Sequence, residues 1–358
     1  MKRNTLQQVV VLLLFMVVGL FSSCSKEQTA GGLMGASGKP YDVLLVVDKG
    51  YLSDGVADTV KRVLQRPVLA MPQEEASMKV QTVATQDFDG FLQFVRNILI
   101  VEINHERFTQ ASVKFAYDRW AGGQVVVMLN APDVNSLNKF LEENGAALVN
   151  LFMRSELFNF ATEHAKAYSA EADNRAMRLF NKHISIPQDI VSYKEGKDFL
   201  WMSNNAIRKR LDVTIYRLPY DGRKLTGEYL LAVRDSVMAE NIPGGIEGSY
   251  ATTAKYELYT RNISIADDKE SILELRGLWE MTGGEMMGGP FVLHARIDED
   301  RKYVYFVEGF VYHPNENKRD LMQNLESSLF TFRSAEQKLF DPAPLRRMQW
   351  TKTEPLSL

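Results

Sequence analysis

Three side chains in one segment have the types that acid–base catalysis needs. His294, Glu308 and Glu280 lie within residues 277–314, which read GLWEMTGGEMMGGPFVLHARIDEDRKYVYFVEGFVYHP. A histidine and a carboxylate that a fold holds within hydrogen-bond reach of one substrate can move a proton to and from it. The segment therefore offers candidates for a hydrolase site, although packing on a sheet is the commoner role for such residues.

The elements that carry these residues are expected to be two strands of a hairpin. A loop at 299–300 pairs Leu293 with Phe306 and puts Glu308 on an apolar face, with His294 on the opposite face. A buried Glu308 would need a cation nearby, unless it lies at the sheet edge in water. The candidate cations are Arg276 and Arg296.

Aromatic side chains of the same strands favour a second interpretation, a binding surface. Aromatic rings on a rigid sheet make good anchors for a partner. The residues concerned are Trp279, Tyr303, Tyr305 and Tyr312. A sheet face covered by helices needs the same residues for packing, and this alternative stays open.

Composition and motifs exclude several classes of protein. Forty-two basic and 45 acidic residues leave a net charge of -3, so no overall field attracts the chain to nucleic acid. One cysteine excludes an internal disulfide, and none of the five histidines lies four residues from another. Nucleotide-loop, serine-hydrolase and metalloprotease motifs are absent. No cofactor and no metal are expected.

The beginning of the chain has the pattern of an export signal. Two basic residues precede an uncharged run from Val9 to Leu20, and two serines then precede Cys24. The run is shorter than the roughly 20 residues that span a bilayer, so a signal peptide over residues 1–23 is expected. Cys24 lies where such a signal is cleaved and resembles the lipidated cysteine of bacterial lipoproteins. An unmodified thiol is the alternative.

A lipid on Cys24 would attach the protein permanently to a membrane, because each buried methylene group of an acyl chain contributes about 0.8 kcal/mol. Residues 24–40 are rich in small and polar types and are expected to form a flexible tether. The expected location is the cell envelope, on the periplasmic side of the outer membrane. Exposure at the cell surface is the alternative location.

Strand and helix patterns alternate after the tether. A strand, a helix, several strands and a long helix are expected in residues 41–183, and a similar order returns in residues 184–333. This order predicts an α+β fold of two tandem units with mixed or antiparallel sheets and flanking helices. The units are either duplicates or unrelated. Residues 334–358 are polar and proline-rich and are expected to form a disordered tail.

Short motifs in the second unit carry a resemblance to a known family. The motifs are GLWE at 277–280, MGGPFV at 287–292 and EGFVY at 308–312, with Lys318-Arg319 opening the last helix. They resemble the uncharacterised lipoprotein family of the Bacteroidota catalogued as domain of unknown function 4837. Residues 38–41 and 186–187 also fit, so the similarity is expected to extend from Cys24 to about Arg333. The resemblance implies an envelope lipoprotein and supplies no catalytic residues, because the family has no assigned activity.

Two functions remain as hypotheses. The preferred one is a non-catalytic, lipid-anchored envelope protein that binds a protein or glycan partner. The alternative is an envelope hydrolase with acid–base groups near His294 and Glu308. A carboxylate–histidine cluster lining a deep pocket would favour the hydrolase, whereas a flat face with exposed Tyr303 and Tyr305 would favour binding.

Overall fold

A computed structural model describes residues 32–53, 55–265 and 271–356 of the chain. The predicted signal peptide and Cys24 lie outside these ranges. Residues 35–358 form one compact unit. No helix within the described ranges combines the length and apolar character that a membrane span requires.

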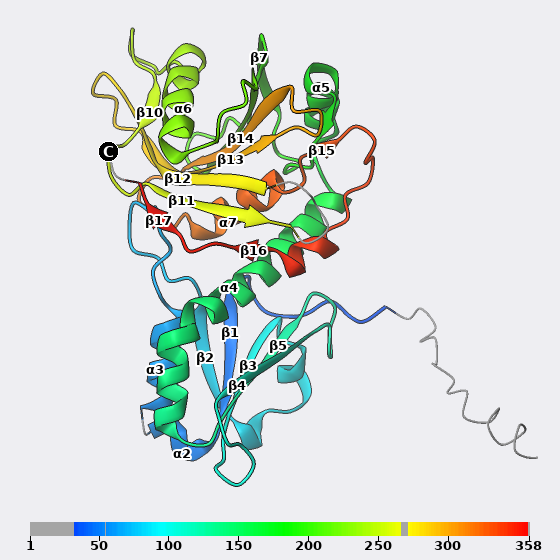
Figure 1. The fold of residues 1–358 in the computed structure, drawn as a ribbon, viewed down its shortest axis with the longest axis vertical. Coiled ribbons are helices and arrows are strands. Elements are labelled where there is room, and N and C mark those ends of the chain that lie inside the picture. Colours follow the sequence, from blue (N-terminus) through cyan, green and yellow to red (C-terminus); the bar gives the residue numbers. More distant parts are fainter. Residues whose placement is uncertain (1–31, 54, 266–270, 357–358) are drawn as a thin grey trace, which may run out of the picture. The chain divides into compact units, whose positions relative to one another are not determined.

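The first sheet is mixed, with the strand order β2-β1-β3-β5-β4 (Figure 1). Four strands are parallel, namely β1 (Asp42–Val47), β2 (Lys79–Ala84), β3 (Asn97–Ile103) and β5 (Val125–Ala131), and β4 (Ser112–Tyr117) runs antiparallel to β5. One face packs on α3 (Val56–Leu64) and α4 (Val134–Lys166), and α2 (Lys49–Ser53) precedes α3. The short helices η2 (Thr85–Asp87) and η3 (Gly90–Phe94) flank the other face. β1 reads as a continuous apolar run because both of its faces are covered.

Local patterns located most of these elements. The strand, helix, several strands and long helix expected in residues 41–183 are all present. Strand β2 has a weak sequence signal, because KVQTVA is largely exposed at the sheet edge. Helix α3 begins after Gly55, whose φ of 77° is left-handed.

Helix α4 packs against both the first sheet and the second sheet of the compact unit. Asp133 caps it, with Oδ1 accepting the Ser136 N–H at 2.8 Å. At 1.5 Å per residue its 33 residues extend for about 50 Å. Phe152 packs in the core of the first sheet, and Leu157 and Ala161 pack beside the second sheet. A new helix, α5 (Ala170–Phe180), follows.

The second sheet is antiparallel throughout. Its main path is β16-β11-β12-β13-β14-β9-β8-β7, with β10 beside β12 and β17 beside β11. The bounds are β7 Ser192–Gly196, β8 Phe199–Ser203, β9 Arg210–Pro219, β10 Ala251–Thr253, β11 Tyr259–Ser264, β12 Ser271–Met281, β13 Gly288–Ile297, β14 Tyr303–Tyr312, β16 Gln349–Trp350 and β17 Glu354–Pro355. Separately, β6 (Lys182–His183) pairs with β15 (Arg333–Ser334).

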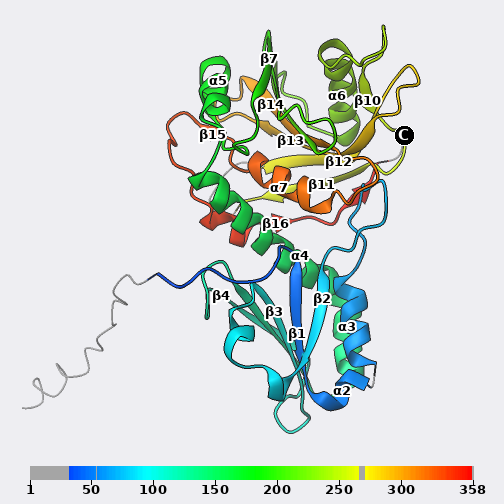
Figure 2. The ribbon, with the colours of Figure 1, turned by 180° about the vertical axis from the view of Figure 1, so that it is seen from behind.

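Helices cover both faces of this sheet (Figure 2). Helix α6 (Gly227–Asn241) packs on one face through Leu230 and Met238. Helix α5 and helix α7 (Arg319–Leu329) pack on the other. The fold is therefore α+β, with mixed and antiparallel sheets and flanking helices, as predicted. The two sheets differ in strand direction and order, which agrees with unrelated units and not with a duplication.

The β13–β14 hairpin has the predicted faces in a different register. Leu293 pairs with Glu308, not with Phe306. The loop is longer than expected because Asp298 Oδ1 accepts the N–H groups of Lys302 at 2.8 Å and Tyr303 at 3.1 Å. A shift of two residues leaves each side chain on its original face, since neighbouring side chains of a strand alternate.

The C-terminal segment corrects the prediction of a disordered tail. Helix η4 (Ala343–Arg347) and strands β16 and β17 lie within residues 334–356, and both strands pair with β11. Leu345 and Met348 are buried together with Ile263 and Phe330. These few apolar side chains order the segment by packing on the second sheet.

Part of the predicted tether is also bound. The N–H of Ala36 donates to Gly122 O at 2.9 Å, and the N–H of Ser37 donates to Phe94 O at 2.8 Å. Residues 36–37 therefore belong to the fold, and residues 24–31 lie outside the described ranges.

Candidate functional site

His294 lies in a buried ionic cluster beneath helix α7. It sits opposite Glu274 in the β12–β13 pair, with Nε2 3.5 Å from a carboxylate oxygen of Glu274. The Phe330 ring covers it, with centroids 4.6 Å apart. His294 is fully inaccessible to solvent. A substrate therefore cannot reach the imidazole in this conformation.

Two arginines neutralise the acids of this cluster. Arg276 Nε donates to Glu274 at 2.9 Å, and Arg276 Nη2 donates to Glu326 of α7 at 3.0 Å. Arg261 of β11 bridges the same two acids, at 2.8 Å from Glu274 and 3.1 Å from Glu326. Two guanidinium groups thus balance two carboxylates, which joins β11 and β12 to α7 through charge-assisted hydrogen bonds.

The protonation states follow from this arrangement. Burial alone would raise the pKa of Glu274, but the guanidinium groups of Arg261 and Arg276 hold that pKa well below its usual value. Burial lowers the pKa of His294, and Glu274 opposes that shift only in part. The expected state at neutral pH is an ionised Glu274 beside a neutral imidazole.

The same cluster has the donor types of a metal site. Ligand atoms of Glu274, His294 and Glu326 all lie within 4.8 Å of one another. Each carboxylate already accepts hydrogen bonds from both Arg261 and Arg276. A divalent cation there would face two guanidinium charges across a few ångströms, which opposes binding. The geometry fits a structural ion network better than a metal centre.

Glu308 lies on the opposite face of the sheet in a separate buried pair. The Arg234 guanidinium of α6 donates to its carboxylate through Nε at 3.0 and 3.1 Å and through Nη2 at 2.7 Å. Arg234 also donates to Thr253 Oγ1 at 2.6 Å and stacks 3.8 Å from the Phe291 centroid. Burial raises the pKa of Glu308, and Arg234 opposes that shift. The cation is therefore Arg234 and neither Arg276 nor Arg296.

The structure does not bring the three catalytic candidates together. His294 and Glu308 point to opposite faces of the sheet and are each covered by helices. Glu280 is exposed and lies six residues along β12 from Glu274, which is about 20 Å at 3.4 Å per residue. The predicted acid–base constellation is wrong, because a sheet separates two of its members and strand length separates the third.

The predicted aromatic surface is largely core. Trp279 is 4% exposed and donates its indole N–H to Val311 O at 3.1 Å. Tyr305 is 3% exposed, and its hydroxyl donates to Phe180 O at 3.3 Å. Tyr303 and Tyr312 are half-buried. The alternative of a second packed layer is therefore correct for Trp279 and Tyr305.

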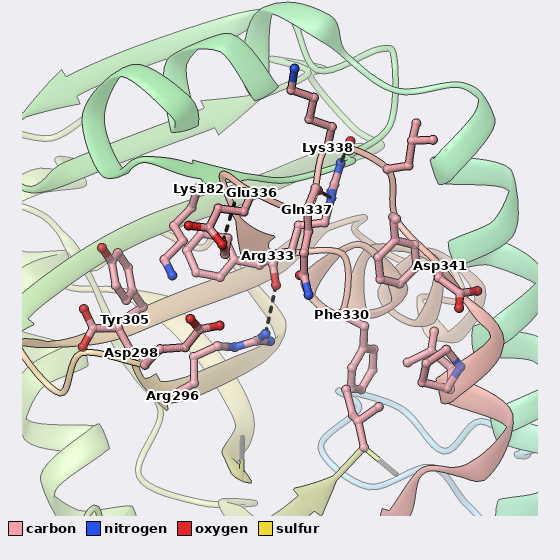
Figure 3. A pocket seen from close by; sticks show the side chains of 18 residues that line it. Lys182, Arg296, Asp298, Tyr305, Phe330, Arg333, Glu336, Gln337, Lys338 and Asp341 are labelled. Carbon is pink, nitrogen blue, oxygen red and sulfur yellow. Dashed lines mark hydrogen bonds between the residues drawn. The ribbon is translucent and has the colours of Figure 1, made fainter. Parts of the chain in front are cut away.

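A pocket of about 530 Å³ lies between the turn end of the β13–β14 hairpin and the C-terminal segment. Figure 3 shows Lys182, Tyr305 and Arg296 on one side and Phe330 and Asp341 on the other. Its outer wall is formed by residues 336–341. The volume lies within the range of ligand pockets in proteins, roughly 300–1,000 Å³.

Two arginines shape this pocket through backbone carbonyls. Arg333 donates to the carbonyl oxygens of Gln337 at 2.7 Å and Lys338 at 2.9 Å, which fixes the outer wall. Arg296 donates to the carbonyl oxygens of Leu329 and Phe332, both at 3.1 Å. Because these guanidinium groups hold backbone, the charged groups facing the opening come from other residues. They are Lys182, Asp298, Glu299, Glu336, Lys338 and Asp341.

Sequence reasoning missed both the ionic cluster and the pocket. Glu274 and Arg276 alternate with apolar residues in β12, and this period-2 pattern of charges in a buried strand was a usable signal for a charged face. Nothing local indicated Glu326 as their partner. The pocket was missed because its outer wall was assigned to a disordered tail.

Two protein-family models match separate parts of the chain. Residues 169–331 match the family described as Domain of unknown function (DUF4837), and residues 36–165 match a family described as Domain of unknown function (DUF8532). No curated protein matches the chain. The predicted extent of the first family is wrong at the front, because residues 38–41 fall within the second match. The three motifs of the hairpin region lie inside the first match, so the resemblance to the DUF4837 family is confirmed for residues 169–331.

Proposed function

We propose that this chain is a lipid-anchored cell-envelope protein that binds a partner and does not catalyse a reaction. The anchor is a lipid on Cys24, supported by the basic start, the apolar run from Val9 to Leu20 and the position of this cysteine after them. The location proposed is the periplasmic side of the outer membrane.

The binding site proposed is the pocket between the β13–β14 hairpin and residues 336–341. The observation that carries the proposal is the contrast between two sets of ionisable groups. His294 and Glu308 are buried beside charged partners, whereas Glu336 and Lys338 are exposed around a hollow that aromatic rings also line. Four acids and two bases lie at the opening, which suits a polar ligand that offers hydrogen-bond donors, such as a peptide segment or a glycan.

The hydrolase alternative requires acid–base groups that reach one substrate. His294 and Glu308 lie on opposite faces of the sheet, so one substrate cannot contact both. A hydrolase would need a different pair, and the carboxylates that line the pocket, Asp298 and Glu336 among them, are the candidates there. Activity on a peptide or glycan that Asp298→Asn and Glu336→Gln both abolish would overturn the binding proposal.

The anchor is tested by fractionation and mass spectrometry. The native protein is expected in the membrane fraction, with Cys24 as its first residue and acyl chains on it. The Cys24→Ala variant is expected in the soluble fraction. A native protein with a free thiol at position 24, or with residues 1–23 still attached, would contradict the anchor.

The pocket is tested by photo-crosslinking in cells. A photoreactive amino acid at position 338 is expected to capture one specific partner, and the added substitution Lys182→Glu is expected to abolish the adduct because Lys182 lines the same hollow. Lys197→Glu, a charge reversal at an exposed site outside the pocket lining, is the matched control and is expected to preserve it. Digestion of the adduct with a protease or a glycosidase then distinguishes the two ligand classes. Equal adducts in both variants would contradict the site.

A further inference from the structure

The described chain joins the first part of the fold beside the short helix η3, which flanks the first sheet. The Ser37 N–H donates to Phe94 O at 2.8 Å, and the Arg96 N–H donates to Ser37 O at 2.9 Å. Phe94 is the last residue of η3. These two hydrogen bonds fix the point at which any tether from Cys24 must leave the folded protein.

Helix η3 presents a large apolar side chain to solvent at this same place. Phe91 is 93% exposed and lies three residues before Phe94, or about 6 Å along a 3₁₀ helix. Its position is fixed by the backbone, because the buried Gln124 amide donates to Gln93 O and Val95 O, both at 2.7 Å. An exposed aromatic side chain therefore lies on an anchored stretch of backbone beside the exit point of the tether.

Further apolar side chains lie on and beside η3, where Phe88, Leu92 and Trp120 pack against one buried cluster. The rings of Phe88 and Trp120 are half-buried and meet edge to face at 6.0 Å, and the Arg119 guanidinium lies 4.5 Å from the Trp120 ring centroid. We call this area the η3 surface, formed by Phe88, Phe91, Leu92, Arg119 and Trp120. Aromatic rings with an adjacent cation are typical of proteins that lie on the interface of a bilayer.

The length of chain before the fold limits the distance to the membrane. Gly35 lies eleven positions after Cys24 in the chain, with ten residues between them. Even a fully extended chain of this length spans no more than about 40 Å. The η3 surface lies at the folded end of this segment, so a lipid on Cys24 would keep it close to the bilayer at a high local concentration.

We propose that the η3 surface docks on the bilayer that holds the lipid of Cys24, with Phe91 inserted at the boundary between headgroups and acyl chains. The inference rests on the anchor in the proposed function. Exposed Asp87 and Asp89 balance Lys39 and Arg119 around the surface, so apolar insertion, and not attraction to anionic lipid, is the driving force. Docking would turn the molecule so that one fixed side of the first sheet faces the membrane.

The single cysteine of the chain makes the test direct. In the lipidated protein the Cys24 sulfur carries the acyl chains, so Phe91→Cys supplies the one free thiol. The matched controls are Ile207→Cys and Met286→Cys, at apolar residues that are 92% and 96% exposed in loops of the second half. Each variant is labelled with an environment-sensitive fluorophore and reconstituted in vesicles of phosphatidylethanolamine and phosphatidylglycerol.

The expected result is a blue-shifted emission at position 91 and several-fold stronger quenching by spin-labelled lipids there than at positions 207 and 286. High salt is expected to leave the quenching unchanged. Equal, weak quenching at all three positions, in protein that floats with the vesicles, would overturn docking and leave the anchor intact. Protein that does not float with the vesicles would overturn the anchor, and the docking inference with it.

Discussion

The carboxylate of Glu308 and the guanidinium of Arg234 form a pair in which neither side chain is more than 1% exposed. The pair fixes α6 on the second sheet, because Arg234 comes from the helix and Glu308 from β14. An acid that the sequence suggests for catalysis is thereby used to join two elements.

Breaking this pair is expected to destabilise the protein strongly. Arg234→Met leaves a buried charge without a counterion, which costs about 3–5 kcal/mol of unfolding free energy. Adding Glu308→Leu should restore most of the loss, because a well-packed apolar replacement of a buried pair is close to neutral. Urea unfolding measures both effects.

Arg223→Met, at an exposed pair with Asp221, is the control and should change the unfolding free energy little. A double variant as unstable as the single one would contradict this account.

Glu75 is expected to stabilise the contact between the segment before β2 and the start of helix α7. Its carboxylate accepts the backbone N–H groups of Lys318 at 2.7 Å and Arg319 at 2.9 Å, at the start of α7. Glu75→Ala leaves both N–H groups without an acceptor at the positive end of a helix, and should lower the unfolding free energy by about 2 kcal/mol. The neighbouring exposed residue supplies the control Glu74→Ala. Equal stability of the two variants would show that water replaces the cap at no cost.

The buried His294 predicts a loss of stability in mild acid. Burial lowers its pKa, so the unfolded chain takes up this proton at a higher pH than the folded protein does. The unfolding free energy should therefore fall as the pH drops below about 6.5, by at most about 1.4 kcal/mol per pH unit for this group. The charged groups nearest to the imidazole are Glu274, Glu326 and Arg296, and Phe330 excludes water.

His294→Gln is expected to flatten this pH dependence between about pH 6.5 and pH 5. It should not remove it, because burial also lowers the pKa of His164 and the sign of that effect is the same. The exposed His105→Gln is the control. Denaturant unfolding at a series of pH values measures the slopes, and identical slopes in His294→Gln and the wild type would disprove the assignment.

The C-terminal segment is expected to resist proteolysis. Arg346 pairs with Asp118 at 2.9 Å and stacks 3.8 Å from the Phe158 ring centroid, while Leu345 beside it is 1% exposed. Native trypsin digestion should therefore spare Arg346 and Arg347, since cleavage needs locally unfolded backbone. Asp118→Ala releases the segment without altering the cleavage site, and should speed cleavage there. Rapid cleavage of the wild type would support the disordered tail.

Prediction from the sequence worked where a structure depends on neighbouring residues. The order expected in residues 41–183, a strand, a helix, several strands and a long helix, is present, because side-chain periodicity and caps are local properties. The face of each side chain in the hairpin was also correct. The register was not, because one side chain, Asp298, extended the loop.

The candidate site was less accessible to the same reasoning. Whether His294 meets Glu274 or Glu308 depends on which strands pair and which helices cover them. Glu326 is separated by about fifty residues from Glu274 in the chain, and Arg276 Nη2 joins it at 3.0 Å. Contacts of this range follow from packing of whole elements, which no local pattern encodes.

The sequence by itself determined the α+β class and the position of most strands and helices. It also predicts an export signal that ends at the single cysteine. Tertiary structure alone decided that the acid–base candidates are structural ion pairs, that the C-terminal segment is ordered and that a pocket lies behind it. The physical reason is that periodicity records which side of an element is buried, whereas the partner of a buried charge is selected by the whole fold.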